Sequence, residues 1–230
     1  MIRLNKVLSL GLLHLVRNNK QQSSIPKYLS YSLFPQRLWS TKITPYYFST
    51  MKSDVELAIS LLNEGKHAEA IKVGKGYIEA FKGDKIQDSD YILAHKLVGI
   101  GLKTMNDYYS ALPYYQAWLN LTIKKYGENH VATCESYREL GALYLSLSKM
   151  DEAKEYLKKS VRIAQGLSDY SSIELASTYR DLGQAYHKEG NFNEALEHVH
   201  KAMSIAEKEK ILVPGLSHCL GIIYRDMRYQ

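Results

Sequence analysis

The stretch YRDLGQAYHKEGNFNEALEHVHKA, residues 179–202, decides the fold of this chain. Within it an aliphatic residue precedes Gly183, a tyrosine follows three residues later, and Ala195 comes twelve residues after the glycine. The same pattern starts at Gly141 and at Gly99, each 42 residues before the next. A period between about twenty and fifty residues indicates stacked structural repeats, so the search for function turns from an active site to a binding surface.

The pattern resembles the tetratricopeptide repeat (TPR), which places an aromatic residue, Leu-Gly and Tyr on a first helix and an alanine on a second. The chain offers four such units and a final half-unit. Their central dipeptides are Leu57-Ala58, Val98-Gly99, Leu140-Gly141, Leu182-Gly183 and Leu220-Gly221. The resemblance implies an all-α fold, a right-handed superhelical array of antiparallel helix hairpins. It covers essentially all of residues 51–230, which we take as the TPR domain.

The period of 42 residues is longer than the ~34 residues of the common TPR. The extra length lies between hairpins, as in residues 125–132, and that insert resembles the linker of kinesin-light-chain-type repeats. Gly65 and Gly190 stand where a first helix must end and reverse. The sequence therefore predicts left-handed backbone at these two glycines.

The positive charge of the chain is concentrated at its start. Residues 1–53 contain eight Lys or Arg and no acidic residue, whereas the remainder contains 22 basic and 24 acidic side chains. The sequence pI of about 9.0 therefore describes the leader, and it does not indicate nucleic-acid binding by the folded part. No apolar run is long enough to predict a transmembrane helix.

Residues 1–50 are expected to be a transit peptide followed by a disordered linker. Residues 2–16 can form a basic amphipathic helix, and Arg37-Leu38-Trp39-Ser40 resembles a matrix-peptidase cleavage site. This composition is typical of mitochondrial import, to the matrix or to an inner-membrane-associated complex. A plastid transit peptide, a secretory signal and a tail that targets nothing remain alternatives. If the leader is not cleaved, a cytoplasmic location is expected.

The TPR resemblance implies a groove lined by the first helices. Basic residues recur at the groove positions, three residues before the glycine and four or five after it. They are Lys96, Lys103, Arg138, Arg180, His187, Lys188 and Arg225. Acidic residues at these positions are few, which favours an acidic peptide or subunit as the ligand. The alternative is that these side chains are an ordinary solvated helix face.

One position argues against a well-known TPR ligand. Chaperone-binding TPRs carry an asparagine one residue after the glycine, where this chain has Ile59, Ile100, Ala142, Gln184 and Ile222. Binding to heat-shock-protein tails is therefore not expected. Kinesin light chains also favour asparagine there, so the same departure weighs against peptide binding of their kind.

Two apolar features leave alternatives open. Trp118 occupies a place where the repeat usually has a small residue, and it is either a core residue or an exposed anchor. Residues 216–224 are rich in large apolar side chains. This final half-unit either caps the fourth hairpin or docks on another subunit or a second copy.

Nothing in the sequence nominates catalytic residues, a metal site or a cofactor. Cys134 and Cys219 are far apart and are expected to be buried thiols. His198 and His200 are two residues apart, so on a helix they point to different sides. We therefore expect a non-catalytic protein–protein interaction scaffold, most simply a mitochondrial assembly factor or accessory subunit. A cytosolic TPR adaptor is the alternative, and an organellar RNA-binding repeat protein is a weaker one.

Overall fold

A computed structural model describes residues 44–81, 88–168 and 170–228, with side chains from Asp54 onward. All of them belong to one compact unit, and their regular structure is helical throughout. In chain order the helices are α2 (Thr44–Asn63), α3 (His67–Ala80), α4 (Ser89–Thr104), α5 (Tyr108–Tyr126), α6 (Val131–Ser146), α7 (Met150–Gln165), α8 (Ser172–Lys188), α9 (Phe192–Glu209) and α10 (Leu216–Met227).

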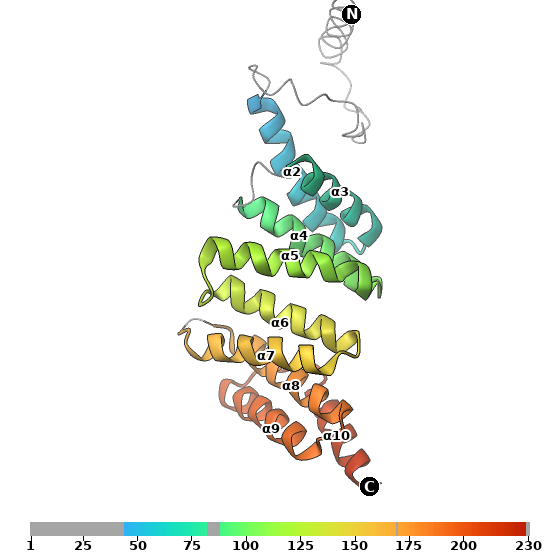
Figure 1. Cartoon of the computed structure of the whole chain (residues 1–230), viewed down its shortest axis with the longest axis vertical. Coiled ribbons are helices and arrows are strands. Elements are labelled where there is room, and N and C mark those ends of the chain that lie inside the picture. The colour runs from blue at the N-terminus through green and yellow to red at the C-terminus, as the bar shows by residue number, and fades with distance from the viewer. Residues whose placement is uncertain (1–43, 82–87, 169, 229–230) are drawn as a thin grey trace, which may run out of the picture. The chain divides into compact units, whose positions relative to one another are not determined.

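The helices form four hairpins, α2/α3, α4/α5, α6/α7 and α8/α9, followed by α10 (Figure 1). Each helix packs on the next, and each hairpin follows the previous one along the stack. Hydrophobic side chains fill the space within and between the hairpins in three successive clusters. The expected fold class, an all-α array of antiparallel hairpins with a final half-unit, is confirmed.

The glycines of the repeat signature allow the two helices of a hairpin to approach closely. A Cβ atom built on Gly141 would lie 2.7 Å from Cγ of Leu157, and one on Gly183 would lie 2.6 Å from Cγ2 of Val199. A Cβ atom on Gly99 would meet the ring of Tyr115 at 3.0 Å. Side-chain atoms do not approach so closely, so any larger residue would push the two helices apart.

The turns inside the four hairpins share one backbone geometry. The residue in the left-handed conformation is Gly65, Asn106, Ser148 or Gly190, with φ of 74°, 61°, 59° and 80° respectively. In each turn the next residue donates its N–H to the carbonyl five positions earlier, which closes the end of the first helix. The prediction for the two glycines is confirmed.

The start of α2 corrects the expected linker. The helix begins at Thr44, so residues 44–50 are helical although we assigned them to the linker. Pro45 stands in the first turn, where its missing N–H has no helical partner to lose and its fixed φ suits a helix. The leader and cleavage site expected within residues 1–43 lie outside the described residues.

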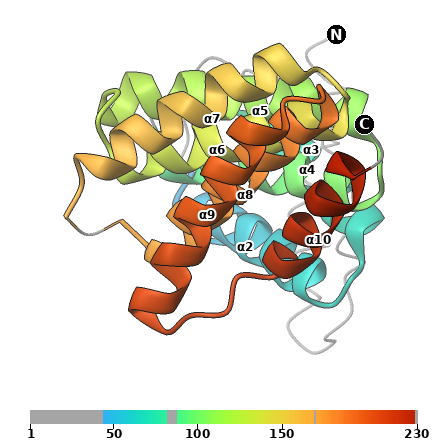
Figure 2. The same ribbon diagram turned by 90° about the horizontal axis from the view of Figure 1, so that it is seen from below.

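The structure shows how the two apolar features, Trp118 and residues 216–224, are packed. Trp118 is buried beside Tyr115, with ring centroids 5.9 Å apart, so it belongs to the core. The α10 helix buries Leu216, Cys219 and Ile223 in the same cluster as residues of α8 and α9. Figure 2 shows α10 beside the α8/α9 hairpin. One side of α10 therefore caps the fourth hairpin.

Candidate protein-binding face

The basic residues expected in the groove belong to successive first helices. We call their side of α4, α6, α8 and α10 the first-helix face. It carries two rows of positions, three residues before and four after each signature glycine, which a helix places on one side because seven residues make about two turns. The described members of the first row are Lys96, Arg138, Arg180 and His218, and those of the second row include Lys103, His187 and Arg225.

Two lysines of α4 reach across to α6. The Nζ of Lys96 lies 2.6 Å from Oε1 of Glu135, and the Nζ of Lys103 lies 2.9 Å from Oε2 of Glu139. About a quarter of each lysine side chain is exposed, 26% and 29%. Both ion pairs are thus reachable from solvent while they link consecutive hairpins.

Arg138 of α6 lies deeper in the face and continues this chain of charges. Its Nη2 lies 2.9 Å from Oε1 of Glu139 and 3.8 Å from Oε1 of Glu174 on α8. Burial alone would raise the pKa of Glu139, but the positive charges of Lys103 and Arg138 outweigh it and hold that pKa below its usual value. The carboxylate therefore stays ionised between two cations.

Arg180 of α8 is held by its own neighbour and by the segment before α10. Its Nε and Nη2 donate to Oδ1 of Asp181 at 3.0 and 2.7 Å, and its Nη1 donates to the carbonyl of Pro214 at 2.6 Å. Burial raises the pKa of Asp181, and the adjacent guanidinium opposes that shift. Arg138 and Arg180, which the sequence predicted in the groove, both bind carboxylates of this chain.

The remaining predicted residues connect α8 to its neighbours on both sides. His187 places Nε2 2.8 Å from Oδ2 of Asp226 on α10, and Nε of Arg225 lies 2.8 Å from Oδ1 of the same carboxylate. These contacts hold the pKa of Asp226 below its ordinary value, with the hydrogen bond from Arg225 as the largest cause. Lys188 is exposed and its Nζ donates to the carbonyl of Leu145 on α6 at 3.3 Å.

The expectation that acidic residues are few on this face is wrong. Six of the seven predicted residues meet five carboxylates, from Glu135, Glu139, Glu174, Asp181 and Asp226, whereas Lys188 meets a backbone carbonyl. Three of these acids, Glu139, Asp181 and Asp226, each directly follow a basic residue of the rows in the sequence. The stacking of one hairpin on the next brings the other two, Glu135 and Glu174, to cations of the preceding hairpin, and no spacing within one helix could reveal that.

The described residues offer few side chains arranged for catalysis or metal binding. They contain no group of three His, Cys, Asp or Glu side chains placed to hold a metal ion. Both cysteines are buried as expected, and burial raises the pKa of Cys219 to about 11, which disfavours its nucleophilic thiolate. His198 stacks on Tyr186 with ring centroids 5.2 Å apart, while His200 is exposed, so the two histidines do not converge.

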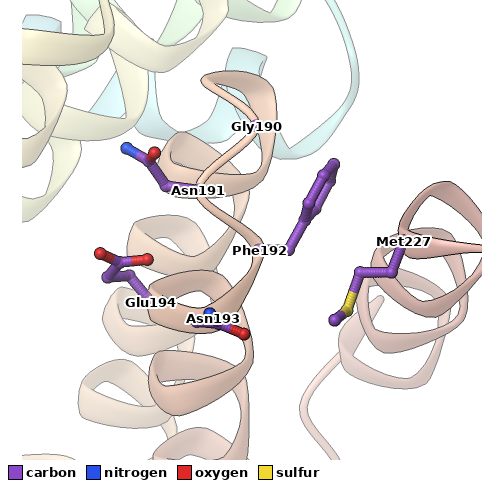
Figure 3. A pocket seen from close by; sticks show the side chains of 6 residues that line it. All are labelled: Gly190, Asn191, Phe192, Asn193, Glu194 and Met227. Atoms are coloured by element: carbon purple, nitrogen blue, oxygen red, sulfur yellow. The ribbon is translucent and has the colours of Figure 1, made fainter. Parts of the chain in front are cut away.

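Two surface pockets recur at equivalent places of the repeat. The first, of about 310 Å³, lies between residues 190–194 at the start of α9 and Met227 at the end of α10 (Figure 3). The second, of about 290 Å³, lies between residues 65–69 and Met105 at the end of α4. Their recurrence indicates that they follow from the stacking geometry, where a hairpin turn meets the next first helix.

No helix in the described part of the chain combines the length and the apolar character that crossing a membrane requires.

Solved structures share this fold at low sequence identity. BtubC (BKLC) from P. vanneervenii is 20% identical with a TM-score of 0.66, over 71% of this chain and 66% of that one. The putative kinesin light chain nearly identical TPR-like repeats of Podosopora anserina are 20% identical with a TM-score of 0.62, over 79% and 89%. MamA is 21% identical with a TM-score of 0.56, over 70% and 80%. Such identities establish a common fold and nothing finer.

A search of the curated proteins gave no match. The family model of the tetratricopeptide repeat matches residues 91–166 and 140–208. Together the two matches span residues 91–208, 118 of the 230 residues. Repeats of this family generally form non-catalytic scaffolds that bind other proteins. With hairpins, turns and signature glycines in register, the chain belongs to the tetratricopeptide repeat family, with repeats like those of kinesin light chains.

Proposed function

We propose that this protein is a mitochondrial scaffold, an assembly factor or accessory subunit, that binds an acidic segment of a partner protein on its first-helix face. The observation that carries the proposal is the two rows of cations that run across α4, α6, α8 and α10. Membership of a family of protein-binding repeats supports the general role. The basic, acid-free leader supports the location.

An acidic ligand would bind by replacing carboxylates of this chain in their ion pairs with the cations of the face. The cations of the face are paired with carboxylates of this chain, but the ion pairs of Lys96 and Lys103 are partly exposed to solvent. A ligand carboxylate can replace Glu135 as the partner of Lys96 at small net cost, because a solvent-exposed ion pair contributes only about 0–1 kcal/mol. The internal acids then make the face selective, since a weakly acidic ligand cannot displace them.

The binding test uses an array of acidic and neutral twelve-residue peptides as the probe. The double variant Lys96→Glu/Lys188→Glu should bind the acidic peptides at least tenfold more weakly than the unmodified full chain. The matched control is Lys158→Glu/Lys201→Glu, which reverses two charges on the second helices α7 and α9 and should change binding less than twofold. Circular dichroism checks that both variants fold.

Equal losses in the two double variants would show a general charge effect and would remove the first-helix face as the site. Raising the salt concentration should also weaken binding of the acidic peptides, because the interaction is electrostatic and partly exposed.

The location is tested separately by mass spectrometry of a C-terminally tagged copy purified from cells. A mature N-terminus within about residues 38–51 is the expected result of import and cleavage. An intact Met1 would contradict the mitochondrial role and would favour the alternative, a cytosolic adaptor.

A further inference from the structure

The last described helix carries the repeat signature, but no second helix among the described residues packs against its signature glycine. Leu220, Gly221 and Tyr224 of α10 stand in the register that Leu182, Gly183 and Tyr186 occupy in α8. A Cβ atom built on Gly221 would meet no described atom within 4 Å. The equivalent glycines of α4, α6 and α8 all face a second helix at contact distance.

The side chains beside Gly221 are uncovered in the same way. The residue preceding the glycine is fully buried at Leu140 and Leu182, whereas Leu220 is only partly buried. The tyrosine three residues after the glycine is 6% exposed at Tyr144 and 45% exposed at Tyr224. With Met227, which is 37% exposed, these residues form one apolar side of α10, which we call the open face.

The open face does not result from loose attachment of α10. The neighbouring side of the helix buries Leu216, Cys219 and Ile223 in the cluster shared with α8 and α9. The α10 helix therefore packs on the preceding hairpin as the earlier first helices do. It differs from them because no second helix among the described residues covers its open face.

The internal hairpins define the chemistry of a helix that fits such a face. Each second helix of the three closest pairs places an alanine twelve residues after the glycine and a large residue four positions further on. These pairs are Ala111 and Tyr115, Ala153 and Leu157, and Ala195 and Val199, and all six side chains are almost fully buried. A matching ligand is an amphipathic α-helix with the pattern Ala-x-x-x-large.

The charges at the C-terminal end of α10 indicate the orientation in which such a helix would bind. An antiparallel helix would begin near the C-terminal end of α10, close to Arg228. The second helices α3, α7 and α9 carry acidic residues in their first turns, Glu69, Asp151, Glu152 and Glu194. The C-terminal end of α10 has Arg225 and Arg228 against one acidic residue, Asp226, so its net positive charge complements such a helix start.

We propose that the open face of α10 binds an amphipathic helix of a partner protein, acidic in its first turn, as α8 binds α9. The same positive charge disfavours a second copy of α10 as the occupant, because two segments of equal sign would meet. The large side chains of this site are directed away from the rows of the first-helix face, whereas Gly221 lies one turn from His218 and Arg225 of those rows. The proposal does not rest on the function proposed above.

The probe is a synthetic peptide of residues 191–209, the sequence of α9, labelled at its N-terminus. Fluorescence anisotropy with the full chain should show saturable binding, and Gly221→Leu should weaken it at least tenfold. A peptide with Ala195→Leu should bind equally poorly, because a large side chain cannot enter where the glycine requires close approach. The control His218→Leu adds a leucine on the groove row of the same helix and should bind the peptide normally.

Several outcomes would overturn the proposal. One is absence of binding, and another is binding that survives Gly221→Leu, since the peptide would then have replaced α9 within the array. Sedimentation velocity showing a dimer that Gly221→Leu dissociates would assign the face to a second copy. Hydrogen exchange in residues 1–43 that increases only in Gly221→Leu would assign it to this chain's own N-terminal segment. The Lys96→Glu/Lys188→Glu variant should bind the α9 peptide normally, so the two sites can fail independently.

Discussion

At the scale of single residues, the hairpin turns require a left-handed backbone that only two of the four turns fill with glycine. Ser148 adopts φ of 59° in the third turn, where an L-residue costs roughly 1–2 kcal/mol. Glycine removes that strain but adds unfolded-state entropy of about 0.5–1 kcal/mol. We therefore expect Ser148→Gly to raise the free energy of unfolding by about 0.5–1 kcal/mol, measured by urea denaturation.

The control for this prediction makes the same chemical change two residues earlier. Ser146 lies in the last turn of α6, where glycine is a poor helix former, so Ser146→Gly should lower stability by up to about 1 kcal/mol. If both variants shift stability in the same direction, the turn is not under backbone strain.

At the scale of helix pairs, replacing a signature glycine by alanine should lower or raise stability according to whether a second helix faces that glycine. A methyl group added to Gly141 would lie 2.7 Å from Cγ of Leu157 and 3.1 Å from its backbone nitrogen. Overpacking of this kind costs about 1–3 kcal/mol, against a gain of about 1 kcal/mol in helix propensity. Gly141→Ala should thus lower the free energy of unfolding, measured by urea denaturation, by up to about 2 kcal/mol.

The matched variant is Gly221→Ala in α10, where the new methyl group meets open space. Only the helix-propensity gain remains there, so stability should rise by about 0.5–1 kcal/mol in thermal and chemical denaturation. A loss of stability at Gly221 would mean that part of the chain outside the described residues already covers this face.

At the scale of the whole repeat array, buried charge couples consecutive hairpins. Glu139 is 17% exposed and bridges Lys103 of α4 and Arg138 of its own helix, so its removal leaves two cations short of a partner. Glu139→Gln should lower the free energy of unfolding at pH 7 by about 3 kcal/mol. Because the folded pKa is lowered, this stabilisation is present above about pH 4.5 and fades as pH falls through the folded value.

The measurement compares urea denaturation of the two proteins at pH 7 and pH 4. The stability difference between them should begin to narrow at pH 4, because Glu139 then takes up a proton in the unfolded chain while its lowered pKa opposes protonation in the folded one. A constant difference would assign the effect of the substitution to packing rather than to charge.

The repeat spacing was sufficient to predict the fold because each unit repeats the same local rules. Gly99, Gly141 and Gly183 marked the close helix pairs, and Gly65 and Gly190 marked two of the turns. Asn106 and Ser148 stand 42 residues apart and in register with those glycines, so the period could have predicted their left-handed backbone. Residue type gave no indication at Ser148, because serine rarely adopts the left-handed conformation.

The candidate site was harder to predict because its electrostatics depend on neighbours from other helices. Helical periodicity was enough to place Lys96, Arg138 and Arg180 in one row and to predict the order of the hairpins. The acids that directly follow Arg138 and Arg180 are visible in the sequence, but the pairing of Lys96 with Glu135 and of Arg138 with Glu174 depends on the tertiary structure. The same is true of Gly221, since among the helical signature glycines it is the one at which an added Cβ atom would meet no described atom within 4 Å. Periodicity fixes the side of a helix on which a residue lies, whereas its partners depend on how one hairpin is stacked against the next.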